Sequence, residues 1–151
     1  MKTIIFYARS LQCKFYGLIG LRLQDKYNIL YLVQKDNEEK TIKELGCRGQ
    51  VYNIQTFFEK NWNNNSKLQS IDLENFEELY KIPSLWGIFY TDRFLNKFKL
   101  ADSKKLIKLH IALFDEIFSK NKINMLVNEE IAIFSSYISA WRTNIDTMFS
   151  C

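Results

Sequence analysis

The segment TIIFYA at Thr3–Ala8 begins the stretch of sequence that decides the fold. It is a short, continuous apolar run rich in β-forming residues, which is typical of a central strand covered on both faces. Ser10 then predicts a helix N-cap, and the helix is expected to run to about Asp25. Its apolar positions recur at helical spacing: Leu11, Phe15, Leu18, Ile19 and Leu23. After a turn at Asn28, the apolar run ILYLV at Ile29–Val33 predicts a second strand.

The residues that follow repeat this alternation. Glu38–Leu45 predicts a short charged helix, which Gly46 closes at the position where helices commonly end in glycine. Gln50–Ile54 predicts a third strand. The order β-α-β-α-β over residues 1–55 predicts a parallel, right-handed, doubly wound sheet.

The middle of the chain changes character. Asn61–Ser66 is polar and predicts a loop, and Asp72 predicts the cap of a helix over Leu73–Tyr80. Pro83 interrupts this helix, because proline removes a backbone donor and fixes φ. A further helical segment is expected over Ser84–Phe98.

The last part of the chain begins with a strong amphipathic helix, predicted from Asp102–Ser103 to about Asn121. Its inner side is predicted to carry Leu106, Leu109, Leu113, Ile117 and Phe118. Ile123–Val127 predicts a fourth strand and Ile131–Trp141 a final helix, while Arg142–Cys151 has no clear assignment. We therefore expect residues 1–151 to form one α/β, Rossmann-like domain. Its parallel sheet would have about four or more strands, helices on both faces and a helical insertion between strands three and four.

Composition narrows the class of protein. The net charge of +4 comes from 21 basic and 17 acidic residues scattered along the chain, so no nucleic-acid partner is expected. Apolar residues make up 47% of the chain, which excludes intrinsic disorder. No stretch approaches the roughly 18 apolar residues of a transmembrane segment. Cys13, Cys47 and Cys151 share no metal-ligand spacing, and we expect reduced thiols in a cytosolic protein, with Cys13 buried on a helix.

The predicted topology nominates a site without any motif, because ligands of open parallel sheets bind outside the carboxyl ends of the strands. The polar residues that follow the four predicted strands are Arg9 and Ser10, then Gln34, Lys35 and Asp36, then Gln55 and Thr56, and finally Asn128, Glu129 and Glu130. The turn after the first strand lacks glycine, whereas a dinucleotide site needs a glycine-rich turn there. This argues against an NAD or FAD enzyme, and we expect neither a cofactor nor a metal ion in this chain.

The pair Glu129-Glu130 has two readings. Two carboxylates at a strand end supply a general base whose pKa is raised by its neighbour. Alternatively, Glu130 favours the first turn of the following helix through its charge, and Glu129 is simply exposed. Adjacent residues point in different directions, so we do not expect both to act together. His110 is the only histidine and has no partner motif, which favours a structural or exposed residue.

The segment LYKIPSLWGIFYTDRFL at Leu79–Leu95 resembles a segment of bacterial capsule and surface-polysaccharide biosynthesis proteins. There, a Y-x-I-P-x-L-W stretch runs into an aromatic Y-x-D-R ending before a long helix. A strand with an acidic residue at its end follows, similar to Met125–Glu129 here. That family has a GT-B-like architecture of two Rossmann-like domains facing a cleft, the acceptor side first and the nucleotide-sugar side second. The resemblance covers most of residues 1–140 in the order of elements.

The resemblance implies that this chain is the N-terminal, acceptor-binding domain of a glycosyltransferase-like protein, with the nucleotide-sugar donor held by a second domain absent from it. Glu129 is then the candidate catalytic base or acceptor contact. The candidate substrate-binding residues are Arg9, Ser10, Gln34, Gln55, Asn128 and Glu130. The implied partners are a saccharide or lipid-linked acceptor and a second domain or subunit, and the implied location is the cytoplasm, at the inner membrane surface. We expect no transfer by this chain alone.

The alternative is a non-catalytic α/β interaction or regulatory module. A set of aromatic residues recurs at helical spacing: Trp86, Phe89, Tyr90 and Phe94. The interaction module predicts an exposed apolar patch around Trp86 and Tyr90 and a featureless edge at the strand ends. The enzyme domain predicts the reverse, buried aromatics and a polar, concave edge.

Overall fold

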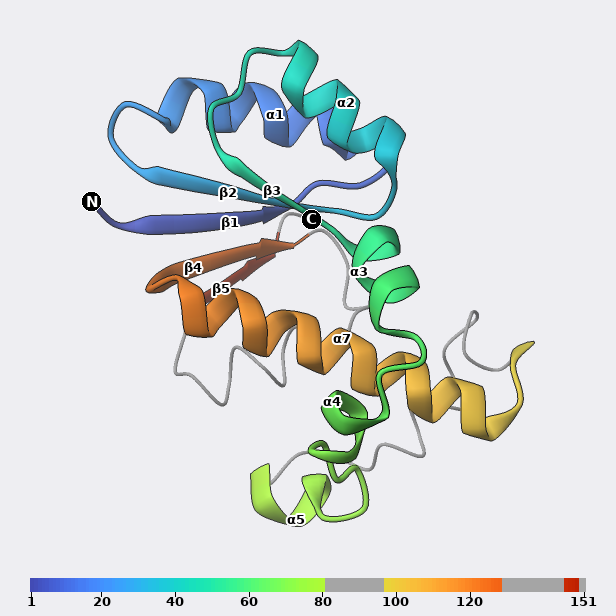
Figure 1. Cartoon of the computed structure of the whole chain (residues 1–151). Coiled ribbons are helices and arrows are strands. Elements are labelled where there is room, and N and C mark those ends of the chain that lie inside the picture. The colour runs from blue at the N-terminus through green and yellow to red at the C-terminus, as the bar shows by residue number, and fades with distance from the viewer. Residues whose placement is uncertain (81–96, 129–145, 150–151) are drawn as a thin grey trace.

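A five-stranded, all-parallel sheet forms the centre of the computed structural model, which describes residues 1–80, 97–128 and 146–149 (Figure 1). Its strands are β1 (Thr3–Tyr7), β2 (Asn28–Val33), β3 (Gln50–Asn53), β4 (Ile123–Asn128) and β5 (Asp146–Phe149). They lie in the order β3-β2-β1-β4-β5. This is the Rossmann strand order, so the predicted α/β, Rossmann-like class is confirmed.

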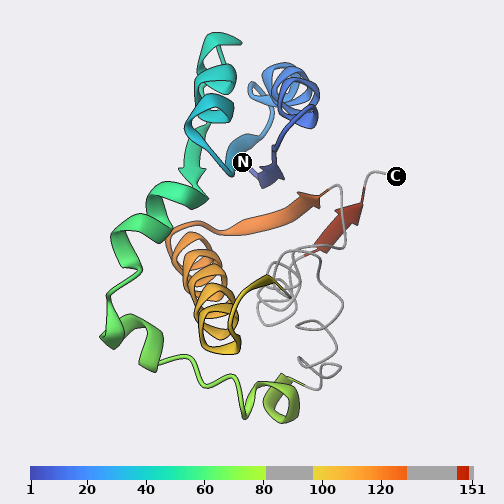
Figure 2. The same cartoon turned by 90° about the vertical axis from the view of Figure 1, so that its right-hand side faces the viewer.

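Helices cover both faces of the sheet. The described helices are α1 (Gln12–Leu23), α2 (Asp36–Glu44), α3 (Ile54–Asn61), α4 (Asn65–Gln69), α5 (Phe76–Tyr80) and α7 (Leu100–Lys120). Figures 1 and 2 show α1 and α2 on one face and α3 and α7 on the other. All four of α3, α4, α5 and α7 come between β3 and β4 in the chain.

The two-sided cover explains why β1 and β2 are apolar at every position after their first residue. Alternate strand residues point to opposite faces, so Ile4 and Phe6 pack toward α1 while Ile5 packs toward α7. The α1 side also contains Cys13, Tyr16, Ile29, Tyr31 and Val33. The α7 side contains Leu30, Leu32, Leu113, Phe114 and Ile117. Burial of both faces is what a parallel sheet requires.

A separate apolar cluster holds the segment after α3 against the first half of α7. Its buried residues are Ile71, Leu73, Phe76, Leu106, Ile107, Ile111 and Ala112. The predicted polar loop at Asn61–Ser66 is only partly correct, because α4 begins at Asn65 and Asn61 is buried. The Asn61 side chain donates to the Phe57 carbonyl at 2.8 Å, so its amide is a helix-end partner and not a solvated loop group.

Several predicted element boundaries shift for local physical reasons. Ser10 is not an N-cap: its φ is +50°, and α1 begins at Gln12. The third strand ends at Asn53, whose side-chain oxygen accepts the Thr56 amide and caps α3. The long helix α7 starts at Leu100, before the predicted Asp102–Ser103. Residues 142–151, which had no assignment, contain β5.

Glycine is required at position 46 by the backbone conformation and at position 20 by the lack of space for a side chain. Gly46 has φ +80°, which confirms it as the left-handed residue that closes α2. Gly20 packs against the Tyr31 side chain of β2, since a Cβ there would be 1.9 Å from the Tyr31 hydroxyl oxygen. Tyr31 is fully buried, and burial, with the Cys47 thiol beside it, raises the pKa of Tyr31 well above its ordinary value. Close packing of α1 on the sheet therefore depends on a missing side chain.

Candidate functional site

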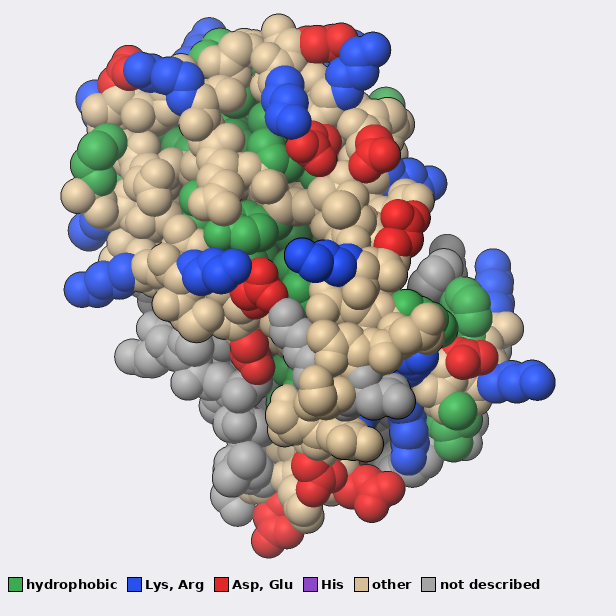
Figure 3. Space-filling model, in the orientation of Figure 1, with side chains coloured by type: hydrophobic (Ala, Val, Ile, Leu, Met, Phe, Trp, Pro, Cys, Tyr) green, Lys and Arg blue, Asp and Glu red, His purple; other side chains and the backbone are tan. Residues whose placement is uncertain are grey.

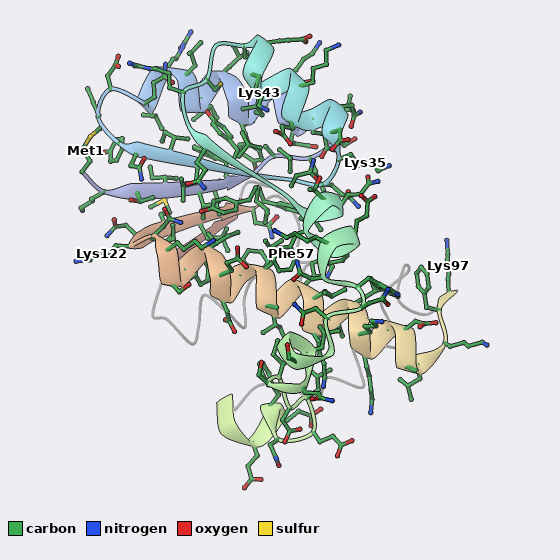
Figure 4. All side chains as sticks on the ribbon, viewed as in Figure 1. Met1, Lys35, Lys43, Phe57, Lys97 and Lys122 are labelled. Carbon is green, nitrogen blue, oxygen red and sulfur yellow. The ribbon has the colours of Figure 1, made fainter. Side chains whose placement is uncertain are left out.

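The carboxyl ends of the strands form the edge at which a ligand is expected. We call this edge the carboxyl rim; among the described residues it consists of those that follow β1, β2 and β3 and of Asn128, the last residue of β4. Figure 4 shows Lys35 at this edge and Met1 and Lys122 at the opposite one. Between β1 and β4 the strand order reverses, because β2 and β3 extend the sheet to one side and β4 and β5 to the other. This point is the topological switch point, where open parallel sheets bind ligands.

The β1–α1 turn lies at the switch point and has an unusual backbone. Ala8 is fully buried, and its amide donates to the Leu32 carbonyl at 2.8 Å. Ser10 takes the left-handed φ of +50°, which costs a non-glycine residue about 1–2 kcal/mol. The Arg9 guanidinium lies 5.8 Å from the centre of the Tyr7 ring. The turn thus replaces the expected helix cap with a strained residue, and a neighbouring group must hold it.

That group is the Glu38 carboxylate, in the first turn of α2. One of its oxygens accepts the Ser10 amide at 2.7 Å. The other accepts the Gln34 amide at 2.7 Å and the Lys35 amide at 3.1 Å. Glu38 is buried, with 7% of its surface exposed. A single carboxylate therefore ties the β1–α1 turn to the β2–α2 turn.

This arrangement places the Glu38 carboxyl group at the turn where a Rossmann fold usually binds a phosphate. Phosphate binding at such a rim uses backbone N–H groups of the turn after β1 and of the adjoining helix. Here the Ser10 amide points at Glu38 instead. A diphosphate approaching this turn would lose that donor and meet a carboxylate. The contact between Ser10 and Glu38 therefore agrees with the absence of a glycine-rich, dinucleotide-binding turn after β1.

Glu38 was not among the sequence candidates. Its position three residues after Lys35, the N-cap of α2, is the glutamate position of a capping box. Lys35 is not one of the usual capping residues, so the short motif is incomplete. The contact with Ser10 joins residues 28 positions apart, and no local pattern contains it.

The ends of β2 and β3 are joined to each other. The Gln55 amide donates to the Gln34 carbonyl at 3.2 Å, and the Gln55 side chain donates to Glu59 at 2.9 Å along α3. Asn53 donates to Asp36 at 2.7 Å and to Glu39 at 3.2 Å. The pKa of Glu39 is lowered, first by its hydrogen bond with Lys43 and also by that with Asn53.

Asn128 is the last residue of β4 and is 3% exposed. Since Val127 is in register with Phe6 of β1, Asn128 lies one residue further toward the switch point. The structure thus brings Arg9, Ser10 and Asn128 to the switch point and leaves Gln34 and Gln55 on the β2–β3 side of the rim. The other two candidates, Glu129 and Glu130, lie outside the described residues.

His110, Cys13 and Cys47 make contacts within the protein. His110 contacts the Leu106 carbonyl through Nδ1 at 3.0 Å, and its ring meets Phe58 edge-on at 4.6 Å. Cys13 is buried as expected, and burial, followed by the charge of Glu38, raises its pKa to about 11. Neither Cys13 nor Cys47 is in a disulfide. Across residues 1–80, 97–128 and 146–149, no cluster of histidine, cysteine and carboxylate side chains is able to hold a metal ion.

A shallow cavity of about 400 Å³ lies elsewhere, beside the last turns of α7. Its lining includes Ser70, Asp115, Glu116 and Ser119. Ser119 precedes β4, so this cavity is on the side of the amino ends of the strands and apart from the carboxyl rim. The aromatic set around Trp86 and Tyr90 lies outside the described residues.

Comparison with known proteins assigns no family. No protein-family model matches the chain, and no curated protein matches it significantly. In the parts of the chain that the structure describes, no helix has the length and apolar character needed to cross a bilayer.

Proposed function

We propose that this chain is the acceptor-binding domain of a glycosyltransferase-like protein in capsular or surface-polysaccharide biosynthesis. The observation that supports this most is the Glu38 carboxylate bound to the turn after β1. It leaves a Rossmann-type switch point that disfavours a phosphate and suits a ligand of hydroxyl groups. An acceptor sugar is such a ligand, whereas a nucleotide-sugar donor carries a diphosphate.

The residues at the switch point suit a saccharide. Arg9 offers N–H donors on a half-buried side chain, and Asn128 offers an amide with both donor and acceptor atoms. The preorganised turn at Ser10 adds a fixed backbone beside them. Polar groups on a rigid frame orient the hydroxyl groups of a ligand through hydrogen bonds.

In the proposed reaction, Glu129 follows β4 in the sequence and acts as the general base. It accepts the proton of the acceptor hydroxyl, whose oxygen then attacks the anomeric carbon of the sugar donor while the diphosphate leaves. Glu130 contributes to acceptor binding. The donor and the groups that balance the diphosphate charge belong to a second domain or subunit, so this chain alone transfers no sugar. Its place is the cytoplasm, at the inner membrane surface, where a lipid-linked acceptor is available.

A titration followed by nuclear magnetic resonance tests this proposal. The ¹⁵N-labelled chain is titrated with oligomers of N-acetylglucosamine, galactose and glucose, and separately with NADH and with UDP-N-acetylglucosamine. At least one oligosaccharide is expected to shift the amides of Arg9, Ser10 and Asn128, and NADH is expected to leave them unchanged. The Arg9→Ala variant should bind that oligosaccharide more weakly. Arg48→Ala is the matched control, because Arg48 is exposed just before β3, at the opposite edge.

Two results would overturn the proposal. One is that NADH or the nucleotide sugar shifts the rim amides, since the rim would then accept phosphate despite Glu38. The other is that no oligosaccharide in the panel shifts any rim amide. In the second case the non-catalytic interaction module becomes the better description, and one observation already favours it: Leu11, Phe15 and Leu18 are large apolar residues exposed along α1 and at its N-cap.

A further inference from the structure

Helix α1 is apolar on both sides. Its buried face consists of Cys13, Tyr16, Gly17 and Gly20. On the opposite side, the exposed fractions of the N-cap residue Leu11 and of Phe15 and Leu18 are 87%, 56% and 51%. These three residues are spaced i, i+4 and i+7 and form one continuous line, which we call the α1 stripe. Scattered exposed apolar residues need no explanation, but a helical line of three large ones does.

The charged residues of α1 are all cationic. Lys14 and Arg22 are exposed, and the sequence of the helix, QCKFYGLIGLRL, contains no acidic residue. At 3.6 residues per turn, these two cations and the α1 stripe fall within an arc of about 100°. By contrast, lysine, arginine and carboxylate side chains are interspersed over the face seen in Figure 3. The outer side of α1 thus combines apolar and cationic side chains, whereas the face in Figure 3 carries cations and carboxylates side by side.

We propose that the outer side of α1 docks on an anionic phospholipid bilayer. A helix with large apolar residues and flanking cations lies in the interface, its apolar side chains entering the headgroup boundary while the cations meet lipid phosphates. Leu11, Phe15 and Leu18 are the inserting residues, and Lys14 and Arg22 are the phosphate contacts.

A second copy of the chain fits this face less well. Pairing two α1 helices would bring Lys14 and Arg22 near their own copies, with no acidic residue of α1 to offset the repulsion. The α1 stripe is also short: the seven helical steps from Leu11 to Leu18 rise about 10 Å. A stable protein interface buries about 800 Å² on each partner, far more than three side chains provide.

Docking through α1 would also orient the carboxyl rim. Leu11 directly follows Ser10, so the N-terminal end of α1 brings the switch point toward the bilayer. A lipid-linked acceptor would then reach the rim without leaving the membrane. This last consequence rests on the proposed function, whereas the docking itself rests on α1 alone.

Co-sedimentation with vesicles tests the inference. The chain is mixed with sucrose-loaded vesicles of phosphatidylcholine alone or of phosphatidylcholine with phosphatidylglycerol. Binding is expected only to the anionic vesicles and should be lost near 1 M salt, where the Debye length is about 3 Å. The variant Lys14→Gln/Arg22→Gln should bind roughly 25-fold more weakly, at about fivefold for each cation. The variant Leu11→Gln/Phe15→Gln/Leu18→Gln should bind at least about tenfold more weakly.

Phe98→Gln is the matched control, because Phe98 is similarly exposed but precedes α7. Its binding should equal that of the unaltered chain, and circular dichroism should show all variants folded. The inference is overturned if the unaltered chain does not bind anionic vesicles. It is overturned as well if Phe98→Gln loses binding while the α1 variants keep it. It is also overturned if sedimentation velocity shows a dimer that Phe15→Gln dissociates and no vesicle binding occurs. Vesicle binding needs no saccharide, so its failure and that of the proposed function are separately visible.

Discussion

Replacement of Glu38 by alanine is expected to cost this protein much of its stability. Three backbone amides, those of Ser10, Gln34 and Lys35, donate to the carboxylate at 2.7, 2.7 and 3.1 Å. A hydrogen bond to a charged group contributes about 1.5–3 kcal/mol. We take the lower value for each, because water reaches part of the rim and replaces some of the lost contacts. The expected loss for Glu38→Ala is therefore about 3–5 kcal/mol.

Glu38→Gln should fall between the parent and the alanine variant. The amide oxygen of glutamine accepts the bonds on one side, but its NH₂ group faces amide donors on the other. We expect a loss of about 2–3 kcal/mol, since some bonds survive. Urea denaturation followed by circular dichroism measures both variants. Glu44→Ala is the control, because Glu44 is exposed on the same helix and its ion pair with Lys40 is worth less than about 1 kcal/mol.

A loss of less than about 1 kcal/mol in Glu38→Ala would contradict this role of the carboxylate, because solvent would then satisfy the three amides as well as Glu38 does. A second readout addresses the site. In Glu38→Ala the amides are free to receive an external anion, so inorganic phosphate should raise the Tm of this variant and leave that of the parent unchanged. Equal effects of phosphate on both proteins would show that Glu38 does not fill an anion position.

Three further predictions concern α1 and the turn before it. Gly20→Ala should destabilise the protein by about 2–3 kcal/mol in urea denaturation, since its Cβ would overlap the buried Tyr31 hydroxyl. Gly17→Ala is the control: its new methyl group meets the movable end of the Leu45 side chain, so the change in stability should be below about 1 kcal/mol. Ser10→Gly should stabilise the protein by about 0.5–1 kcal/mol, because relief of the left-handed strain exceeds the entropy cost of glycine; a loss of stability in the same assay would contradict the strain. Cys13 has a folded-state pKa of about 11 against an ordinary 9.0, so the folded protein holds this proton more tightly. Its contribution is therefore fully present below pH 9.0 and is lost as the pH rises toward 11. Cys13→Ala should show a smaller decline over that interval, and equal declines would argue against the shift.

The sequence predicted the secondary structure correctly where the pattern of apolar residues within one segment matches its burial. Thr3–Ala8 and Ile29–Val33 could be recognised as central strands because helices cover both faces and every position except Thr3 is apolar. The long helix α7 was recognisable because its buried residues lie on one side. β5 was missed because Asp146–Phe149 is short and alternates weakly.

Helix α1 shows the limit of periodicity as a guide. Leu11, Phe15 and Leu18 have helical spacing and correctly predict a helix, yet all three are exposed. The buried face is built instead from small residues and Tyr16, which permit close approach to the sheet. A helix that is apolar on two sides gives no hydrophobic contrast, so the sequence cannot indicate which side is inward.

The candidate site was predictable in position but not in character. The rule for parallel sheets placed Arg9, Ser10 and Asn128 at the strand ends from topology alone. Glu38 could not be found in this way, because its role depends on an approach between two turns that are distant in sequence. In the proposed function it is the residue that disfavours a phosphate at the rim.

The absence of glycine from the β1–α1 turn and the presence of Glu38 are two aspects of one arrangement. In a dinucleotide site, glycine lets the pyrophosphate approach the backbone, and the ligand supplies the negative charge. Here Ser10 keeps a left-handed φ without glycine, and Glu38 supplies the charge from within the protein. The turn is therefore fixed before any ligand arrives, and a ligand gains nothing by carrying a phosphate to it. In the proposed function, selection at this rim would come from polar groups such as Arg9 and the amide of Asn128, through the geometry of the ligand's hydroxyl groups.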